Sequence, residues 1–182
     1  GGRHYRGNSV DQNFDNYSIE YTFADGMKFF FIGRSEQGCH DEFASYAHGT
    51  KGSAIISTNV HTPGRVRIFK DQNPNLRDYK SANVAGSFSQ PNETEPNPYQ
   101  LEWDDLVTAI RQDKPYNEAK RGAIASLVTS MGRMSAHTGQ IVTYEEMLNC
   151  EHEFAPDADK LTMDSPAPLL ADADGKYPVP EP

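Results

Sequence analysis

The sequence predicts an α+β fold in which the sheet is mainly antiparallel. Extended runs occupy the first part of the chain, helical patterns follow them up to about residue 150, and no internal repeat is visible. A block of strands followed by a block of helices is typical of α+β domains, whereas alternating strands and helices would indicate a parallel sheet. A chain of 182 residues is long enough for one domain with a real core, or for a domain and an appendage.

The first two strands are predicted on either side of a tight turn. Residues 14–23 alternate between large apolar or aromatic side chains and polar ones, which is the pattern of a half-buried strand. Asp25-Gly26 supplies a turn that tolerates positive φ, and a second strand follows over residues 27–32. Its run F-F-F-I places apolar side chains on both faces. We therefore expect both faces to be covered, one by helices and the other by a second layer or a second subunit.

Three further strands are predicted over residues 42–48, 53–57 and 65–69. The turn Gly49-Thr50-Lys51-Gly52 precedes the second of them and superficially resembles a phosphate-binding loop. Its glycine spacing is wrong and a strand follows it, so a hairpin turn is the favoured interpretation. Residues 71–98 are rich in Asn, Pro, Ser and Asp, and we expect them to form one long irregular connection.

The first helix is predicted over residues 99–112. Its apolar side chains recur at helical spacing and make one stripe, which consists of Trp103, Leu106, Val107 and Ile110. We expect Trp103 to pack in the core, in preference to stacking on a sugar.

The second helix is predicted from residue 118 to about residue 137. Asn117 can cap its start, and Gly139 can end it in a left-handed conformation. A capping box, Thr143-x-x-Glu146, then predicts a short helix that ends near Asn149. The expected buried side of the second helix consists of Ala123, Leu127, Met131 and Met134, with Gly122, Ser126 and Gly132 allowing close approach of a neighbour.

Residues 151–182 are expected to form an acidic, proline-rich arm on a domain that spans residues 1–150. The arm holds eight acidic and two basic residues, and therefore −6 of the net charge of −9. It also holds six of the twelve prolines, which exclude a helix or a central strand. Its apolar residues favour an arm that lies along a surface, and a disordered tail is the alternative.

Composition and motifs exclude several functions. The acidic balance argues against nucleic acid as a partner. The chain also contains no run of 18 consecutive apolar residues, which is the length that a membrane-spanning helix needs. Two cysteines, Cys39 and Cys150, exclude a disulfide framework and a four-cysteine zinc site, and leave one bridge possible. The chain contains no dinucleotide fingerprint, no P-loop, no H-E-x-x-H and no G-x-S-x-G.

Basic side chains at two places are candidates for substrate binding. Arg3-His4-Tyr5-Arg6 is a basic, aromatic segment in an acidic protein, and Arg34 follows the second strand. Arginine forks bind carboxylates and hydroxyl-rich substrates well. Solvated arginines at a terminus and a turn are the alternative interpretation.

Three other polar residues have a structural and a chemical interpretation. His40, with Asp41 or Glu42, has the side chains of a metal site, and a polar loop is the favoured alternative. Cys39 is expected to be a small buried residue, since a reactive thiolate would need a nearby base. His137 is expected to add favourable positive charge at a helix C-terminus.

A set of short motifs occurs in a fixed order along most of residues 1–150. Taken together, these motifs resemble the C-terminal domain of the Gfo/Idh/MocA oxidoreductases, the glucose-fructose oxidoreductase and inositol dehydrogenase family. The motifs are Gly1-Gly2-Arg3 ahead of Gly7-Asn8, Asp11, Asp25-Gly26, Gly38-Cys39, Gly49-Thr50-Lys51-Gly52, Asn97-Pro98-Tyr99 before Asp105-Leu106, Ile110-Arg111-x-Asp113-Lys114-Pro115-x-Asn117-Glu118 and Met131-Gly132-Arg133-Met134.

The resemblance implies an open, mainly antiparallel sheet with helices on one face, while the other face commonly packs against a second subunit. It also implies a parent enzyme whose N-terminal Rossmann domain binds NAD or NADP. The glycine-rich fingerprint, the catalytic lysine and the Asp-x-x-x-His pair of the family are absent here. Since the chain also opens without Met, we expect it to be a piece of a longer protein that cannot transfer hydride alone and binds no cofactor itself.

Two functions are therefore carried forward. The first is a substrate-binding and oligomerisation domain of an NAD(P)-dependent oxidoreductase for a sugar, polyol or related compound, forming homo-oligomers through its sheet face. The second is a non-enzymatic acidic domain that binds proteins. No catalytic, cofactor-binding or metal-binding residue is assigned, and the candidates for substrate binding are Arg3, His4, Arg6, Arg34 and His40.

Overall fold

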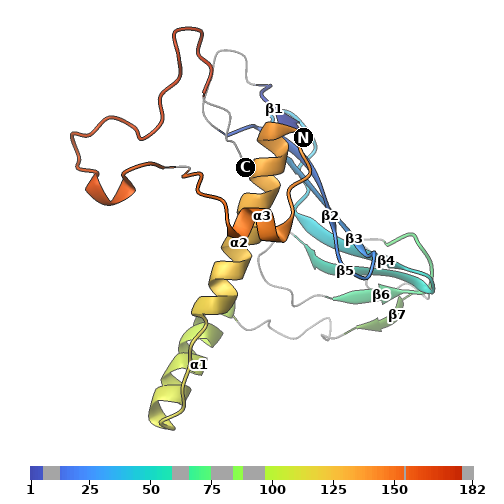
Figure 1. The fold of residues 1–182 in the computed structure, drawn as a ribbon. Helices are drawn as coiled ribbons and strands as arrows, with labels where there is room; N and C mark the ends of the chain where they lie inside the picture. Colours follow the sequence, from blue (N-terminus) through green and yellow to red (C-terminus); the bar gives the residue numbers. More distant parts are fainter. Residues whose placement is uncertain (6–12, 59–65, 75–83, 88–96, 154, 178–182) are drawn as a thin grey trace. The chain divides into compact units, whose positions relative to one another are not determined.

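The computed structural model describes residues 1–5, 13–58, 66–74, 84–87, 97–153 and 155–177. These residues contain seven strands, three α-helices and one 3-10 turn, and the strands form two antiparallel sheets (Figure 1). The α+β class is thus confirmed. The chain divides into two compact units, one of residues 1–39 with 117–182 and the other of residues 40–116.

The first unit holds a three-stranded antiparallel sheet in the order β1-β2-β3. Its strands are β1 (Gly2–Arg3), β2 (Asn16–Thr22) and β3 (Lys28–Arg34). The alternation predicted for the first long strand is confirmed, because Tyr17, Ile19 and Tyr21 are half-buried while Ser18, Glu20 and Thr22 are exposed. The strand β1 was not predicted, since two residues are too few to show a period.

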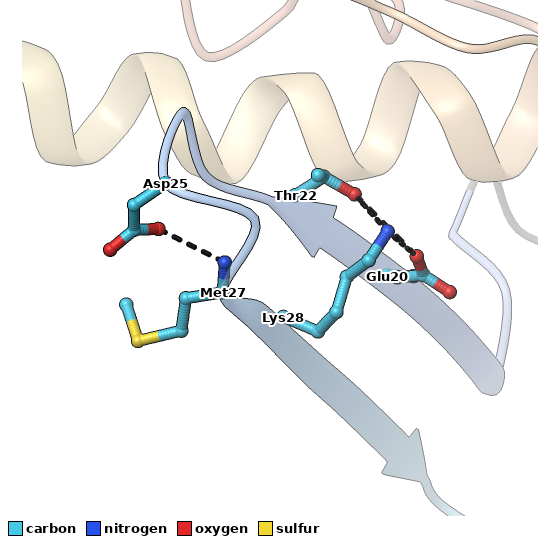
Figure 2. A network of polar contacts seen from close by, with 5 residues as sticks. All are labelled: Glu20, Thr22, Asp25, Met27 and Lys28. Carbon is cyan, nitrogen blue, oxygen red and sulfur yellow. Dashed lines mark hydrogen bonds and ion pairs between the residues drawn. The ribbon is translucent and has the colours of Figure 1, made fainter.

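The predicted turn at Asp25-Gly26 is confirmed as the link between β2 and β3. Gly26 has φ 84°, and its N–H donates to the carbonyl of Phe23 at 2.9 Å. Figure 2 shows the Asp25 carboxylate accepting from the N–H of Met27 at 3.0 Å. One residue further, Lys28 Nζ reaches across to Glu20 Oε1 at 2.5 Å and Thr22 Oγ1 at 2.6 Å. These bonds hold the hairpin in its register.

The apolar run of β3 is exposed in the single chain, so helices do not cover it fully, and cover by a second subunit stays a prediction. The exposed fractions of Phe29, Phe30, Phe31 and Ile32 are 51, 62, 45 and 79%. The side chains of Phe29 and Phe31 share a face with Ile19 and Tyr21, and those of Phe30 and Ile32 lie on the opposite face. The pattern showed correctly which side chains share a face, but a pattern cannot show what covers them.

The helix α2 (Ala119–Thr138) packs its second half against β2. Gly132 permits this contact, because a Cβ atom there would overlap the hydroxyl oxygen of Tyr21 and lie 3.1 Å from Ile19 Cδ1. The Tyr21 hydroxyl donates to the carbonyl of Val128 at 3.1 Å, and Met134 is fully buried. The prediction of a close approach at Gly132 is therefore confirmed.

The first half of α2 differs from the prediction. Ala123, expected to be buried, is exposed, and a Cβ on Gly122 would meet open space. Glu118 takes the N-cap position, although the Asn117 side chain accepts from the N–H of Ala119 at 2.9 Å. At the other end the prediction holds: Gly139 is left-handed with φ 71°.

The short helix α3 (Tyr144–Leu148) begins with the predicted capping box. The N–H of Glu146 donates to Thr143 Oγ1 at 3.2 Å, and the N–H of Thr143 donates to Glu146 Oε2 at 2.7 Å. The arm that follows contains the 3-10 helix η1 (Ala158–Lys160), and none of its described residues 155–177 is buried.

The second unit holds a four-stranded antiparallel sheet in the order β4-β5-β6-β7. Its strands are β4 (Ala44–Gly49), β5 (Gly52–Thr58), β6 (Arg67–Phe69) and β7 (Val84–Ser87), and Ile55 and Phe69 are buried in its core. The hairpin predicted at Gly49 to Gly52 is confirmed. The strand β7 corrects the expectation of one irregular connection over residues 71–98; its four residues carry too weak a pattern to be found without their partner β6.

The helix α1 (Pro98–Arg111) begins at Asn97, whose side chain accepts from the N–H of Tyr99 at 3.0 Å. Ala109 is buried, but Trp103 and Ile110 of the predicted apolar stripe are 63 and 68% exposed. The expectation that Trp103 packs in the core is therefore wrong for this structure.

Candidate functional site

Two of the predicted arginines lie in one row across the sheet of the first unit. Arg3 in β1 pairs with Asn16 in β2, and Asn16 pairs with Arg34 in β3. Directly paired residues place their side chains on the same face of a sheet, and neighbouring strands lie about 4.8 Å apart. The backbones of Arg3 and Arg34 are therefore about 10 Å apart. The row lies on the face opposite to α2, because α2 contacts Ile19 and Tyr21.

Arg3 is held against the next aromatic residue of its segment. Its guanidinium carbon lies 4.4 Å from the centre of the Tyr5 ring and it donates a hydrogen bond to the Tyr5 hydroxyl. That bond raises the pKa of Arg3 further above its ordinary value, so Arg3 stays charged. The N–H of Tyr5 is bound in turn by both carboxylate oxygens of Asp15, at 2.7 and 2.8 Å. Since Asp15 is only 4% exposed, it anchors this segment firmly.

The His4 ring belongs to an aromatic cluster with His137, near the end of α2. The edge of the His4 ring meets Phe14, with ring centres 5.2 Å apart, and Phe14 stacks on His137 at 4.1 Å. The Tyr17 hydroxyl lies 3.2 Å from His137 Nε2 and accepts from the N–H of Phe14 at 3.0 Å. The tautomer of the neutral His137 ring sets which of the two partners, the Tyr17 hydroxyl or Nε2, donates this hydrogen bond.

The pKa of His137 is lowered from 6.5 to about 4. Burial is the largest cause, and the nearby charges of Arg133 and His4 act in the same direction. His137 is therefore neutral at pH 7, which corrects the expectation that it supplies positive charge at the helix C-terminus. An imidazole that titrates near 4 is a weak base, so it is poorly matched to removing a proton from an alcohol.

Two other predicted residues, Arg6 and His40, are not part of the described sheet of the first unit. Arg6 is outside the described residues. His40 belongs to the second compact unit, where its Nε2 lies 3.7 Å from Glu42 Oε2 and its side chain is 81% exposed. In the described part of the chain, no three His, Cys, Asp or Glu side chains gather as metal ligands. Cys39, expected to be buried, is half-exposed, and Cys39 and Cys150 do not form a disulfide with each other.

Sequence reasoning missed four residues that build this region: Phe14, Asp15, Asn16 and Tyr17. Their alternation indicated a strand and placed them on a core face or a solvent face, without suggesting a functional role for any of them. The signal that could have found Asp15 is a carboxylate that stands directly before a strand and close in sequence to a basic segment. The register between strands, which puts Asn16 between two arginines, is not visible along the sequence.

Comparison of the chain with known protein families, with curated proteins and with solved structures finds no match. None of the helices in the described ranges combines the length and the hydrophobicity that a membrane crossing requires.

Proposed function

We propose that this chain is the substrate-binding and oligomerisation domain of an NAD- or NADP-dependent oxidoreductase that acts on a sugar, polyol or related compound. The ordered motifs that resemble the Gfo/Idh/MocA family support this proposal. So does the first unit, an antiparallel sheet with α2 packed on one face. The proposal includes the family's fold for this domain, an open sheet with helices on one side.

The observation that carries the proposal is the row Arg3–Asn16–Arg34 on the sheet face opposite to α2. Guanidinium forks donate several hydrogen bonds in a fixed plane, and an amide both donates and accepts. Vicinal hydroxyls are complementary to such a row, because each hydroxyl can accept from an arginine and donate to the amide oxygen. The Tyr5 ring beside Arg3 adds an apolar surface for the C–H face of a sugar.

In the proposed parent enzyme, hydride passes between a hydroxyl-bearing carbon and the nicotinamide. The cofactor would be held by the Rossmann domain, and proton transfer would use groups outside this chain. The role of this chain is then to bind and orient the substrate.

A titration of the 15N-labelled chain with glucose, myo-inositol and sorbitol tests the proposal by NMR. We expect at least one of these compounds to shift the signals of Arg3, Asn16 and Arg34. The variant Arg34→Met should weaken that binding about tenfold or more, since a hydrogen bond to a charged group contributes about 1.5–3 kcal/mol. The matched control is Arg121→Met, because Arg121 is an exposed arginine of α2 that pairs with Glu118 at 2.8 Å.

Binding that Arg34→Met and Arg121→Met weaken equally would contradict the assignment of the arginine row. The absence of binding for all three compounds, at concentrations of about 10 mM, would favour the second function, an acidic domain that binds proteins. The exposed apolar run of β3 and the net charge of −9 are the observations that support this alternative.

A further inference from the structure

We propose that the outer edge of β3 pairs with the same edge of a second copy of the chain, so that two three-stranded sheets join into one antiparallel sheet of six strands. This contact is a sheet edge, and it differs from the packing of sheet faces that the family resemblance implies. It does not depend on the substrate-binding proposal, because it rests on β3 and on the pairing of β3 with β2.

The hydrogen bonds of β2 show which backbone groups of β3 point outward. The N–H of Ser18 donates to the carbonyl of Gly1, and the N-terminal amine of Gly1 donates to the carbonyl of Ser18, at 2.8 Å each. The backbone groups of Ser18 therefore point toward Gly1 and away from Ile32, its neighbour in β3. In an antiparallel pair, bonded and non-bonded residue pairs alternate. The backbone groups of Ile32 and Phe30 therefore point away from β2, and those of Lys28 and Arg34 at the strand ends point the same way.

Within the strand itself, residues 28–34, β3 lacks the sequence features that usually prevent edge-to-edge pairing. Natural edge strands are protected by proline, by bulges, or by charged side chains in the strand. Here β3 pairs with β2 over seven consecutive residues without a register shift, contains no proline, and keeps its charges at its two ends. In the three-stranded sheet, β3 is a terminal strand, and its four central apolar side chains are 45–79% exposed.

A pairing centred on Phe31 brings all seven residues of β3 into contact with the second copy, because Phe31 is the midpoint of Lys28–Arg34. In this register the outward backbone of Phe30 meets that of Ile32 of the second copy, which is an aromatic and β-branched pair of the kind that stabilises sheets. Phe29 faces Gly33 of the second copy, beside the Phe31 ring that lies 3.1 Å from where a Cβ on Gly33 would be.

The charges at the ends of the strand are compatible with this register. Lys28 would face Arg34 of the second copy, and two like charges directly opposite are unfavourable. However, Lys28 Nζ lies 2.5 Å from Glu20 Oε1, which offsets its charge. There is also room for α2 and for the α2 of the second copy, because each helix packs on its own β2. The two β2 strands would lie three strand spacings, or about 14 Å, apart, whereas the axes of packed helices need only 8–10 Å.

The size of the contact indicates a weak dimer. Phenylalanine side chains cover about 150–250 Å² each when fully buried, so four half-exposed apolar side chains contribute on the order of 400 Å² per copy. Stable interfaces bury about 800 Å² per partner. The dimer should therefore form at high protein concentration and dissociate on dilution.

Disulfide trapping tests the register directly. In a chain with Cys39→Ala and Cys150→Ala, the variant Phe31→Cys places two thiols opposite each other at the symmetry axis. Residues of a non-bonded pair have Cα atoms about 4.5 Å apart, within the range that a disulfide spans. We expect diamide to convert Phe31→Cys into a covalent dimer at least tenfold faster than the control Phe29→Cys, which has similar exposure and lies on the same face.

Equal trapping of Phe31→Cys and Phe29→Cys, or trapping of neither, would overturn the proposal. Sedimentation of the unmodified chain gives a second test, because a monomer at about 0.5 mM would also overturn it. If the dimer forms, the variant Ile32→Lys should abolish it, because this substitution places a charge on the edge. The control Met163→Lys should still form the dimer, because Met163 is an arm residue that is 99% exposed. None of these measurements depends on sugar binding, so a failure of the edge-pairing proposal is distinguishable from a failure of the proposed function.

Discussion

At His137, burial and neighbouring charge outweigh the favourable field of the helix C-terminus. A helix end stabilises a charged histidine by about 0.3–1 kcal/mol at exposed positions. His137 is half-buried against Phe14 and lies near Arg133 and His4, and its pKa falls to about 4 despite its place in the last turn of α2. The ring is therefore a neutral hydrogen-bond partner of Tyr17, whereas its position in the last turn of the helix alone suggested a charged ring.

The stability of the first unit should depend on pH because of His137. Its pKa in the folded chain, about 4, is below the ordinary value of 6.5, so the unfolded chain binds the additional proton first. The contribution of the neutral ring is fully present above pH 6.5 and is lost as the pH falls toward 4. Because solvent screens a half-buried group, we expect a loss on the order of 1 kcal/mol between pH 7 and 5.

Urea unfolding at pH 7 and at pH 5 measures this loss, and NMR titration of the histidine rings measures the pKa itself. The variant His137→Gln keeps a hydrogen-bond acceptor and removes the titrating group, so its pH dependence should be weaker by the same amount. A His137 pKa at or above 6.5 would contradict the prediction.

At the scale of elements, one glycine controls how closely α2 approaches β2. A Cβ at Gly132 would overlap the Tyr21 hydroxyl, whereas a Cβ at Gly122 in the same helix would meet nothing within 4 Å. These two positions therefore separate packing from helix propensity, because alanine is favoured over glycine by about 1 kcal/mol inside any helix.

We expect Gly132→Ala to lower the free energy of unfolding by about 1–3 kcal/mol, since α2 would have to move away from β2. The control Gly122→Ala should raise the free energy of unfolding by up to about 1 kcal/mol. Thermal or urea unfolding of the two variants measures the difference. A stabilising effect of both substitutions would show that the contact between Gly132 and Tyr21 is looser than described.

Local signals predicted elements well and their environments poorly. The turn at Gly26, the helix end at Gly139 and the capping box at Thr143 depend on residues within a few positions of each other, and all three are confirmed. The exposure of Trp103 and the pairing of β7 depend on distant parts of the chain, and sequence reasoning missed both. The arginine row is an intermediate case, because its residues were chosen from chemistry while their alignment is set by strand register.

At the scale of the whole molecule, charge and structure are unevenly divided along the chain. The last 32 residues hold −6 of the net charge of −9, and no described residue between 155 and 177 is buried. The arm has its own local bonds, such as those of the Asp172 carboxylate to the N–H groups of Asp174 and Lys176, at 2.9 and 2.8 Å. Such turns order a segment locally without joining it to a core.

Removal of residues 155–182 should therefore change charge far more than stability. The shortened chain would carry −5 instead of −9 and elute earlier from an anion-exchange column. Because exposed segments contribute little to folding, we expect a melting temperature within about 2 °C of the full chain. A decrease of more than about 5 °C would show that the arm lies against the domain and stabilises it.

The helix α2 is continuous, but its two halves are supported differently (Figure 1). Residues 119–126 are all exposed, whereas Gly132, Met134 and Ala136 are buried. Amide protons that open by local fraying exchange with solvent much faster than those that need the surrounding structure to unfold. Within this one helix, deuterium should therefore enter the first two turns early and the last two turns late, and a ligand or a second copy that covers the first turns would be visible as slower exchange there.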